Sequence, residues 1–285
     1  MKERDLDEFG SLFQRAIIPT IEVSRIAIPN IVVLADGSET ATACGRIAQH
    51  LRGRFRSRVC VHYLRNPGDL AADDHRVVEG DPLAHLRHIT EEEKPSLIIA
   101  PTPLHLDGKE GGGLGDLVDA LLVATSIPTL LVRGTPDASI FQRILVKIPG
   151  GRHDLIEQFS VAFALCGAGG TIRLLHIVNE QDVQRLARVL EITPAIETAG
   201  GTQDLLQAIE TRMDHLLRGA IRAARDAPFL VESAIEVGDP FVIVPRQARD
   251  FSLLIVGSQS SHEEFLSSRA YELIRRLPDV TVLAL

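Results

Sequence analysis

The sequence Val78-Glu79-Gly80-Asp81-Pro82 decides the fold, because nearly the same residues return at Glu236-Val237-Gly238-Asp239-Pro240. Each copy follows an apolar extended segment, and a segment of helical length and a short buried-strand pattern come after it. Aspartate is a preferred N-cap residue and proline is favoured at the first helical position, so each Gly-Asp-Pro predicts a turn from a strand into a helix. Two such turns in the same surroundings predict an internal repeat.

Length and charge restrict the class of protein. The chain has 285 residues, a formal net charge of −8 and a pI of about 5.7. It is long enough for two domains, and it lacks the basic balance of a nucleic-acid-binding protein. No apolar run reaches the ~20 residues of a membrane-spanning helix, and the acidic N-terminus does not have the pattern of a secretory signal. We therefore expect a cytoplasmic protein that binds no nucleic acid.

The first copy of the repeat is predicted to be a domain at residues 29–134. Its elements alternate, with strands at 30–35, 58–64, 75–78, 97–100 and 128–132, and helices at about 39–54, after Pro82 and at 116–125. Only the residues 65–74 separate the second and third strands, which is too short for a usual helical crossover. We therefore expect this copy to lack its second helix.

The second copy is predicted to be a domain at residues 138–285. Its first strand, first helix and second strand are expected at 144–148, 153–167 and 171–178, and its last strand at 280–285. Extra helices at about 180–226 provide the crossover that the first copy lacks. In this alignment His176 takes the place that His62 has in the first copy.

Residues 1–28 form an N-terminal arm outside the repeat. Leu6, Phe9, Leu12 and Phe13 fall on one helical face, which needs a surface to pack on. The arm either covers its own domain or connects the chain to a partner or to a longer parent protein.

Alternating strands and helices imply right-handed crossovers and mainly parallel sheets covered on both faces. The predicted fold class is α/β, with two tandem doubly wound, Rossmann-like sheets of five strands each. The chain resembles the universal stress protein family in its tandem form. The motifs that carry this resemblance are Asp36-Gly37-Ser38 after the first strand, Val61-His62 and Leu175-His176 at strand ends, both Gly-Asp-Pro turns, Leu254-Ile255-Val256-Gly257-Ser258, and the closing helix–strand pairs at 116–132 and 268–285. The resemblance implies strand order 3-2-1-4-5 in each copy, with last strands that can pair between copies.

The resemblance also implies where a nucleotide would bind in the first copy. Members of the family that bind nucleotides have an acidic residue after strand 1, and a Gly-x-x-Gly loop followed by Gly-Ser or Gly-Thr after strand 4. Asp36 is the acidic residue, but Thr102 and His105 stand where the glycines belong, and Asp116 replaces the hydroxyl residue. An aspartate at the start of a helix repels phosphate, so we expect this site to be lost.

In the second copy Pro149 replaces the acidic residue after the first strand. The strand-4 loop keeps a glycine, several hydroxyls and one guanidinium, namely Gly257, Ser258, Ser260, Ser261, Ser267, Ser268 and Arg269. This group could hold an anion at a helix start. The alternative is helix capping by Ser267 or Ser268 alone.

Other groups of reactive side chains favour structural roles. His85 and His88 lie beside Glu91, Glu92 and Glu93, a pattern more typical of a solvated helix face than of a metal site. Cys60 and His62 lie two apart on a strand, so they share a face, and we expect no contact that would activate the thiol.

Cys44, Cys60 and Cys166 are expected to be buried thiols. We also expect no metal, no catalytic residue and no enzymatic activity, because no nucleophile elbow or triad is present.

Three functions remain open. The first is a non-enzymatic cytosolic tandem universal stress protein that acts as a binding or regulatory module without a cofactor. The second is the cytosolic C-terminal regulatory domain of a membrane transporter of the cation-chloride or amino-acid type, with the arm facing the transporter or another protein. The third is a stress protein that binds ATP, or another nucleotide, in the second copy only. A homodimer is expected because one last strand could remain unpaired.

Overall fold

The computed structural model describes residues 19–64, 70–78, 81–104, 114–179, 181, 183–184, 202–257, 268–277 and 279–285. Their strands are β1 (Asn30–Ala35), β2 (Arg58–Tyr63), β3 (Asp74–Val77), β4 (Leu97–Pro101), β5 (Thr129–Val132), β6 (Arg143–Ile148), β7 (Thr171–Val178), β8 (Leu230–Val237), β9 (Leu253–Val256) and β10 (Thr281–Ala284). They form one ten-stranded sheet in the order β3-β2-β1-β4-β5-β10-β9-β6-β7-β8. Each half therefore has the predicted order 3-2-1-4-5, and the α/β fold class is confirmed.

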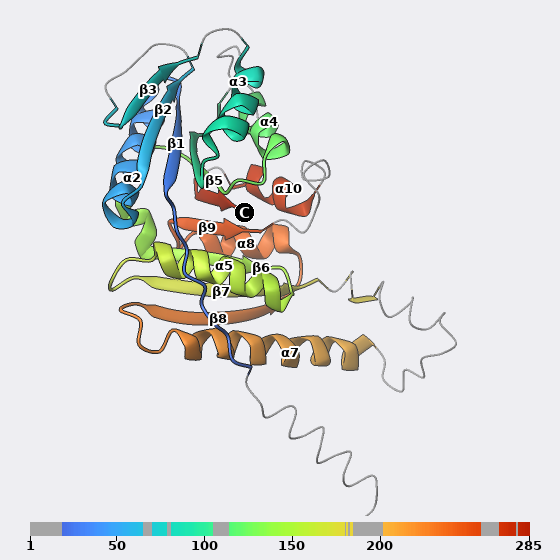
Figure 1. Ribbon diagram of the computed structural model, residues 1–285. Helices are drawn as coiled ribbons and strands as arrows, with labels where there is room; N and C mark the ends of the chain where they lie inside the picture. The colour runs from blue at the N-terminus through green and yellow to red at the C-terminus, as the bar shows by residue number, and fades with distance from the viewer. Residues whose placement is uncertain are drawn as a thin grey trace, which may run out of the picture.

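Helices cover both faces of the sheet (Figure 1). One face is packed by α2 (Glu39–Phe55), α5 (Arg152–Leu165) and α7 (Thr202–Ala223). The other is packed by α3 (Pro82–His88) with the π-helical turn η1 (Ile89–Glu93), and by α4 (Asp116–Ala124), α8 (Pro240–Ala248) and α10 (Arg269–Arg275). A 3₁₀ helix, η2 (Ala138–Gln142), leads into β6. No helix in these described ranges is both long and apolar enough to cross a bilayer.

The two halves meet where β5 pairs antiparallel with β10, while the other strand pairs are parallel. Neither last strand is left unpaired, so the reason for which we expected a homodimer is wrong. Side chains join the halves on both faces as well. Tyr271 of α10 donates a hydrogen bond to Asp119 of α4 over 2.7 Å. On the other face, Arg54 of α2 donates to the carbonyls of Leu165 and Cys166 at the end of α5, where the helix dipole favours a cation.

Both Gly-Asp-Pro turns begin helices as expected. Asp239 caps α8 by accepting a hydrogen bond from the backbone amide of Phe241 over 2.9 Å. Asp81 accepts one from the amide of Ala84 over 3.3 Å at the start of α3. The two copies therefore share a local device that turns the chain from strand into helix.

The expected equivalence of His62 and His176 is wrong. His62 pairs with Leu34, whereas His176 pairs with Ile148, whose structural counterpart in β1 is Ala35. His176 therefore matches Tyr63, one residue further along the strand. Since successive strand residues point to opposite faces, the two histidines lie on opposite faces of the sheet. His176 is buried and donates from Nδ1 to the carbonyl of Ile148 over 3.1 Å.

The connections between strands 2 and 3 differ between the halves. After β2, residues 64 and 70–73 are described and none of them is helical. In the second half α7 precedes β8 and packs on both β7 and β8. The domain boundaries near residues 29, 134 and 138 stay predictions, because the sheet is continuous across them.

Residues 19–28 of the arm lie across the second half before the chain enters β1 in the first (Figure 1). The amide of Ser24 donates to Ser160 of α5 over 2.9 Å, and Arg152 donates to the carbonyl of Thr20 over 2.9 Å. Ile21 is buried in the core under α7. This part of the arm packs on its own chain, while the predicted amphipathic face at residues 6–13 lies outside the described residues.

Replacing Gly219 by alanine tests this packing. A Cβ at position 219 of α7 would lie 2.5 Å from the carbonyl oxygen of Pro19 and 2.9 Å from Ile21 Cγ1. Gly53 of α2 is the matched control, because nothing lies within 4 Å of a Cβ there. Gly53→Ala should raise the free energy of unfolding by about 0.5–1 kcal/mol through helix propensity. Gly219→Ala should lower it and speed tryptic cleavage after Arg25.

Urea denaturation and timed trypsin digestion measure both effects. Equal stabilisation by the two substitutions, with cleavage after Arg25 unchanged, would show that the arm does not lie on α7.

Candidate functional site

The first candidate crevice lies beyond the carboxyl ends of β1 and β4, where strand order reverses. Asp36, the acidic residue predicted to face adenosine, is half-buried and accepts a hydrogen bond from the amide of Ser38 over 3.0 Å. Ser38 in turn caps α2 by accepting from the amide of Ala41 over 3.1 Å. Asp36 therefore shapes the turn that starts α2.

The chain itself occupies the start of α4, where a phosphate would bind in a nucleotide site of this kind. Leu104 is buried, and its carbonyl accepts the amide hydrogen of Leu117 over 3.3 Å. Asp116 and Asp119 add negative charge to the first turn. An anion would therefore meet two carboxylates and an amide that already has a partner. His105 lies outside the described residues.

Gly115 allows this close approach. Its φ is +96°, and a Cβ there would overlap the backbone of Leu104. Gly115→Ala should therefore lower the free energy of unfolding by roughly 3 kcal/mol or more, from backbone strain and displacement of Leu104. Gly134, with φ +62° and open space around it, is the control, and Gly134→Ala should cost only about 1 kcal/mol of strain. Equal losses in chemical denaturation would contradict the packing of Leu104 on α4.

The second candidate crevice lies beyond the carboxyl ends of β6 and β9. Gly257 is half-buried, and a Cβ there would overlap the side chain of Gln158, which is buried on α5. A larger residue at position 257 would therefore displace the amide end of Gln158. Ser268 accepts a hydrogen bond from the amide of Tyr271 over 3.2 Å and caps α10, as the capping alternative predicts. Arg269 follows it and is exposed. Ser258, Ser260, Ser261 and Ser267 lie outside the described residues.

Lys147 is a residue of this crevice that sequence reasoning missed. It is half-buried near the end of β6, and burial, with a smaller contribution from the positive charge of Arg269, lowers its pKa. Within the described ranges it forms no ion pair with an acidic side chain. The second crevice therefore has two neighbouring positive charges, which favour an anion.

A cluster of metal-ligand types lies elsewhere, between β2 and the helical segment before β4. Cys60 Sγ is 3.3 Å from His62 Nε2, which is 3.1 Å from Glu93 Oε1. His62 is fully buried, and its Nδ1 is 2.7 Å from Nε2 of His85. Arg76 Nη1 is 2.6 Å from Glu93 Oε1.

Burial is the main influence on the pKa values of Cys60, His62 and His85. It raises the pKa of Cys60 to about 12, with help from the negative charges of Glu93 and Asp74. It lowers the pKa of His62, against the opposing effect of Glu93, and it lowers the pKa of His85 together with neighbouring His62. Cys60 is therefore a neutral thiol as it stands, and it is not an activated nucleophile.

Cys60 and His62 contact each other, but the raised pKa of Cys60 agrees with the expectation that no contact activates the thiol. The expectation of a solvated helix face is wrong for His85 and Glu93, which contact buried His62. A signal for this was present in the sequence, because Leu86, Ile89 and Glu93 follow the i, i+3, i+7 spacing of a core-facing helical stripe. The expectation of buried thiols is confirmed for Cys44, Cys60 and Cys166.

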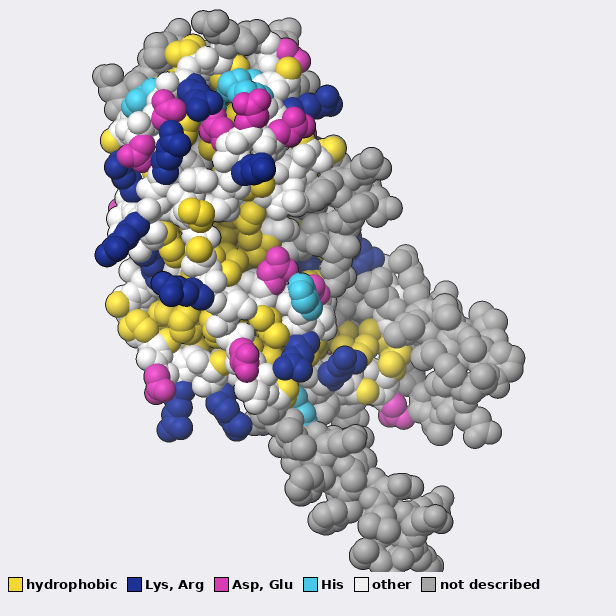
Figure 2. All heavy atoms as spheres, viewed as in Figure 1, with side chains coloured by type: hydrophobic (Ala, Val, Ile, Leu, Met, Phe, Trp, Pro, Cys, Tyr) yellow, Lys and Arg dark blue, Asp and Glu magenta, His cyan; other side chains and the backbone are white. Residues whose placement is uncertain are grey.

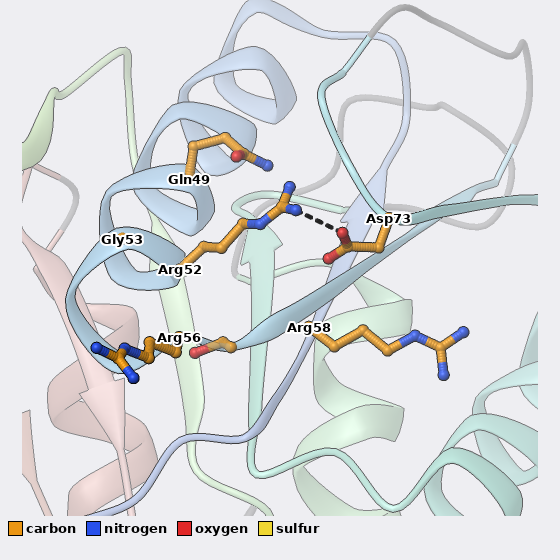
Figure 3. A pocket seen from close by; sticks show the side chains of 7 residues that line it. Gln49, Arg52, Gly53, Arg56, Arg58 and Asp73 are labelled. Carbon is orange, nitrogen blue, oxygen red and sulfur yellow. Dashed lines mark hydrogen bonds and ion pairs between the residues drawn. The ribbon is translucent and has the colours of Figure 1, made fainter.

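Two further hollows do not resemble a ligand site. The first is a wide depression of about 810 Å³ at the end of α2, lined by Arg52, Arg56, Arg58 and Asp73 among others. Arg52 points to Asp73 and pairs with it over 2.6 Å, whereas Arg58 points away (Figure 3). Its one carboxylate is already paired, and the depression is open to solvent.

The other hollow is an apolar cavity of about 220 Å³ in the seam between the halves, lined by Ile28, Phe141, Leu165 and Leu283 among others. Figure 2 shows hydrophobic side chains gathered over the middle of the face across which the arm passes. This cavity lies beside the start of β4 and the end of β10, with Ser96, Leu97 and Leu285 in its lining, so it is at the opposite end of the strands from the first crevice.

Comparison with known proteins places the fold. No protein-family model and no curated protein matches the chain. Among solved structures, a protein of Pseudomonas aeruginosa UCBPP-PA14 described as a universal stress protein matches 91% of this chain and 93% of its own, with TM-score 0.60 and 16% identity. A universal stress protein of Archaeoglobus fulgidus matches 90% and 95%, with TM-score 0.55 and 15% identity.

The cytoplasmic domain of a prokaryotic cation chloride cotransporter matches 91% of this chain and 95% of its own, with TM-score 0.51 and 11% identity. Because these matches span nearly the whole of each chain, they include both halves of the sheet. The protein is therefore built on the fold of the universal stress proteins in its tandem form.

Proposed function

We propose that the protein is a non-enzymatic, cytoplasmic regulatory module that acts by binding another protein. The observation that supports this most is the start of α4, where the Leu104 carbonyl accepts the Leu117 amide and Asp116 and Asp119 repel anions. A helix start satisfied in this way offers no phosphate site. The fold then serves as a rigid scaffold, and function lies in its surfaces.

The alternative of nucleotide binding in the second half has one specific support, the pair of positive charges formed by Lys147 and Arg269. The opposing observations are that Ser268 already caps α10 and that Gly257 packs against Gln158. We therefore propose that neither half binds ATP tightly, and that no cofactor is needed.

Calorimetry with ATP, ADP and cyclic dinucleotides tests this proposal. We expect no saturable heat with ligand up to roughly 1 mM, the concentration at which binding corresponds to only about −4 kcal/mol. The same titration with inorganic phosphate measures the anion preference of the second crevice.

Saturable ATP binding would contradict the proposal. If Lys147→Met removed that binding, the second crevice would be the site and the ATP-binding alternative would stand. Asp36→Asn is the matched control for the first half, where Asp36 is held in the turn before α2.

The second candidate function is a cytosolic regulatory domain of a membrane transporter. It is favoured by the full-length match to a cotransporter's cytoplasmic domain and by the arm, which lies ahead of β1 on the surface of the second half. An open reading frame that continues upstream of Met1 into apolar stretches of ~20 residues would support it. A stop codon with a ribosome-binding site directly upstream would exclude it.

The homodimer stays a prediction, although the unpaired last strand that was the reason for expecting it is absent from the described residues. The sheet now ends at β3 and β8, so any pairing of strands between two copies would use one of these edges.

A further inference from the structure

Three side chains of different chemical type converge under the segment that precedes β4. Cys60 and His62 point from β2 toward the face covered by α3 and η1, and Glu93 points back from the end of η1. Their ligand atoms, one from each residue, all lie within 4.8 Å of one another. Figure 2 shows acidic, basic and histidine side chains intermingled over the upper part of the molecule, where β3 and α3 lie in Figure 1.

We propose that Cys60, His62 and Glu93 form a binding site for one zinc ion. In a tetrahedral zinc site the bond lengths of ~2.3 Å to sulfur and ~2.0–2.2 Å to nitrogen and oxygen separate S from N by ~3.5 Å and N from O by ~3.3 Å. The corresponding separations here are 3.3 Å from Cys60 Sγ to His62 Nε2 and 3.2 Å from His62 Nε2 to Glu93 Oε2. These two separations need to grow by only a few tenths of an ångström to accept the ion, and the sulfur and the carboxylate oxygen lie within 4.8 Å of each other.

The types of ligand select zinc over harder cations. A thiolate and an imidazole suit zinc, whereas calcium and magnesium require oxygen ligands. Three protein ligands leave the fourth tetrahedral position to water, as in the open zinc sites of enzymes. A cavity of about 210 Å³ lined by Cys60, Glu93, Arg58 and Arg76 connects this position with solvent.

Neighbouring residues orient the ligands. Zinc on Nε2 of His62 requires the proton on Nδ1, and that Nδ1 lies 2.7 Å from Nε2 of His85, which accepts it. Arg76 holds one oxygen of Glu93 over 2.6 Å and leaves the carboxylate to turn its other oxygen to the ion. Partners of this kind fix the tautomer and geometry of metal ligands.

The charges balance when the ion binds. The Cys60 thiol gives its proton to solvent as the sulfur becomes a zinc ligand, so thiolate and carboxylate together neutralise the two positive charges of zinc. Arg76 remains beside Asp74, with Nε 3.4 Å from Oδ2. The ion would tie β2 to η1, two segments that contact each other through these side chains.

Cobalt titration of the full chain, first stripped with a chelator, tests the site. Cobalt replaces zinc in tetrahedral sites and absorbs visibly when a thiolate binds it. We expect one equivalent of Co²⁺ to produce a thiolate-to-metal band and tetrahedral d–d bands, and one equivalent of Zn²⁺ to remove both. Cys60→Ser should abolish the thiolate band, and Cys166→Ser, at a buried thiol far from the cluster, should leave it unchanged.

Two further variants separate ligand from supporting roles, with circular dichroism as the check of folding. Glu93→Gln should weaken Zn²⁺ binding and keep the thiolate band, and it decides the matter if Cys60→Ser does not fold. His85→Ala should weaken binding by about 10- to 100-fold, as loss of an orienting partner does. His153→Ala should change nothing, because His153 lies in the first turn of α5 in the other half.

No cobalt band in the unmodified chain would overturn the proposal. A band that survives Cys60→Ser, or Zn²⁺ affinity unchanged by Glu93→Gln, would do the same. The proposal departs from the sequence-based expectation that the protein binds no metal.

Discussion

The antiparallel pairing of β5 with β10 is the interaction on which the rest of the structure depends. Each half ends its sheet with a short four-residue strand, and either strand alone would leave a row of unpaired amides and carbonyls. Pairing Leu131 with Val282 and Leu130 with Leu283 closes both inner edges at once. It makes one sheet whose two ends, β3 and β8, are the outer edges.

This pairing also aligns the helices that flank the seam. The hydrogen bond from Tyr271 to Asp119 links α10 to α4 on one face, and Arg54 links α2 to the end of α5 on the other. Arg133, which follows β5, donates to the carbonyl of Ile274 in α10 over 2.8 Å. The first two contacts join equivalent helices of the two copies, as expected for an arrangement of two repeats about a common axis.

The crevices have diverged while the sheet has stayed alike. Core positions are constrained by close packing from both sides, whereas a residue at a strand end is constrained only by what must bind there. In the first half the space beside α4 is taken by Leu104, and in the second half the space beside Gly257 is taken by Gln158. In each half, residues of the protein itself occupy the space in which a ligand could otherwise bind.

The sequence was sufficient for the strands and the helix starts, because alternating apolar runs and the Gly-Asp-Pro turns are local signals. The order of the strands followed from the resemblance to the universal stress protein family. The sequence could not align His62 with the correct residue of the second copy, because an alternating pattern does not show which of two neighbouring residues faces which side. Tertiary packing decides three contacts that the sequence did not predict. They are those of Leu104 with α4, of Lys147 with the second crevice, and of Glu93 with His62. Of these three, only Glu93 could have been placed from the sequence, because its helical spacing from Leu86 and Ile89 indicates that it faces the core.

Hydrogen exchange of the backbone amides in β5 and β10 tests the central claim most directly. If the two repeats form one continuous sheet through this pair, these amides should exchange as slowly as those of the interior strands β1 and β6, through global unfolding alone. Fast exchange confined to β5 and β10, with β1 and β6 still protected, would show that the halves are separate sheets and would contradict the account.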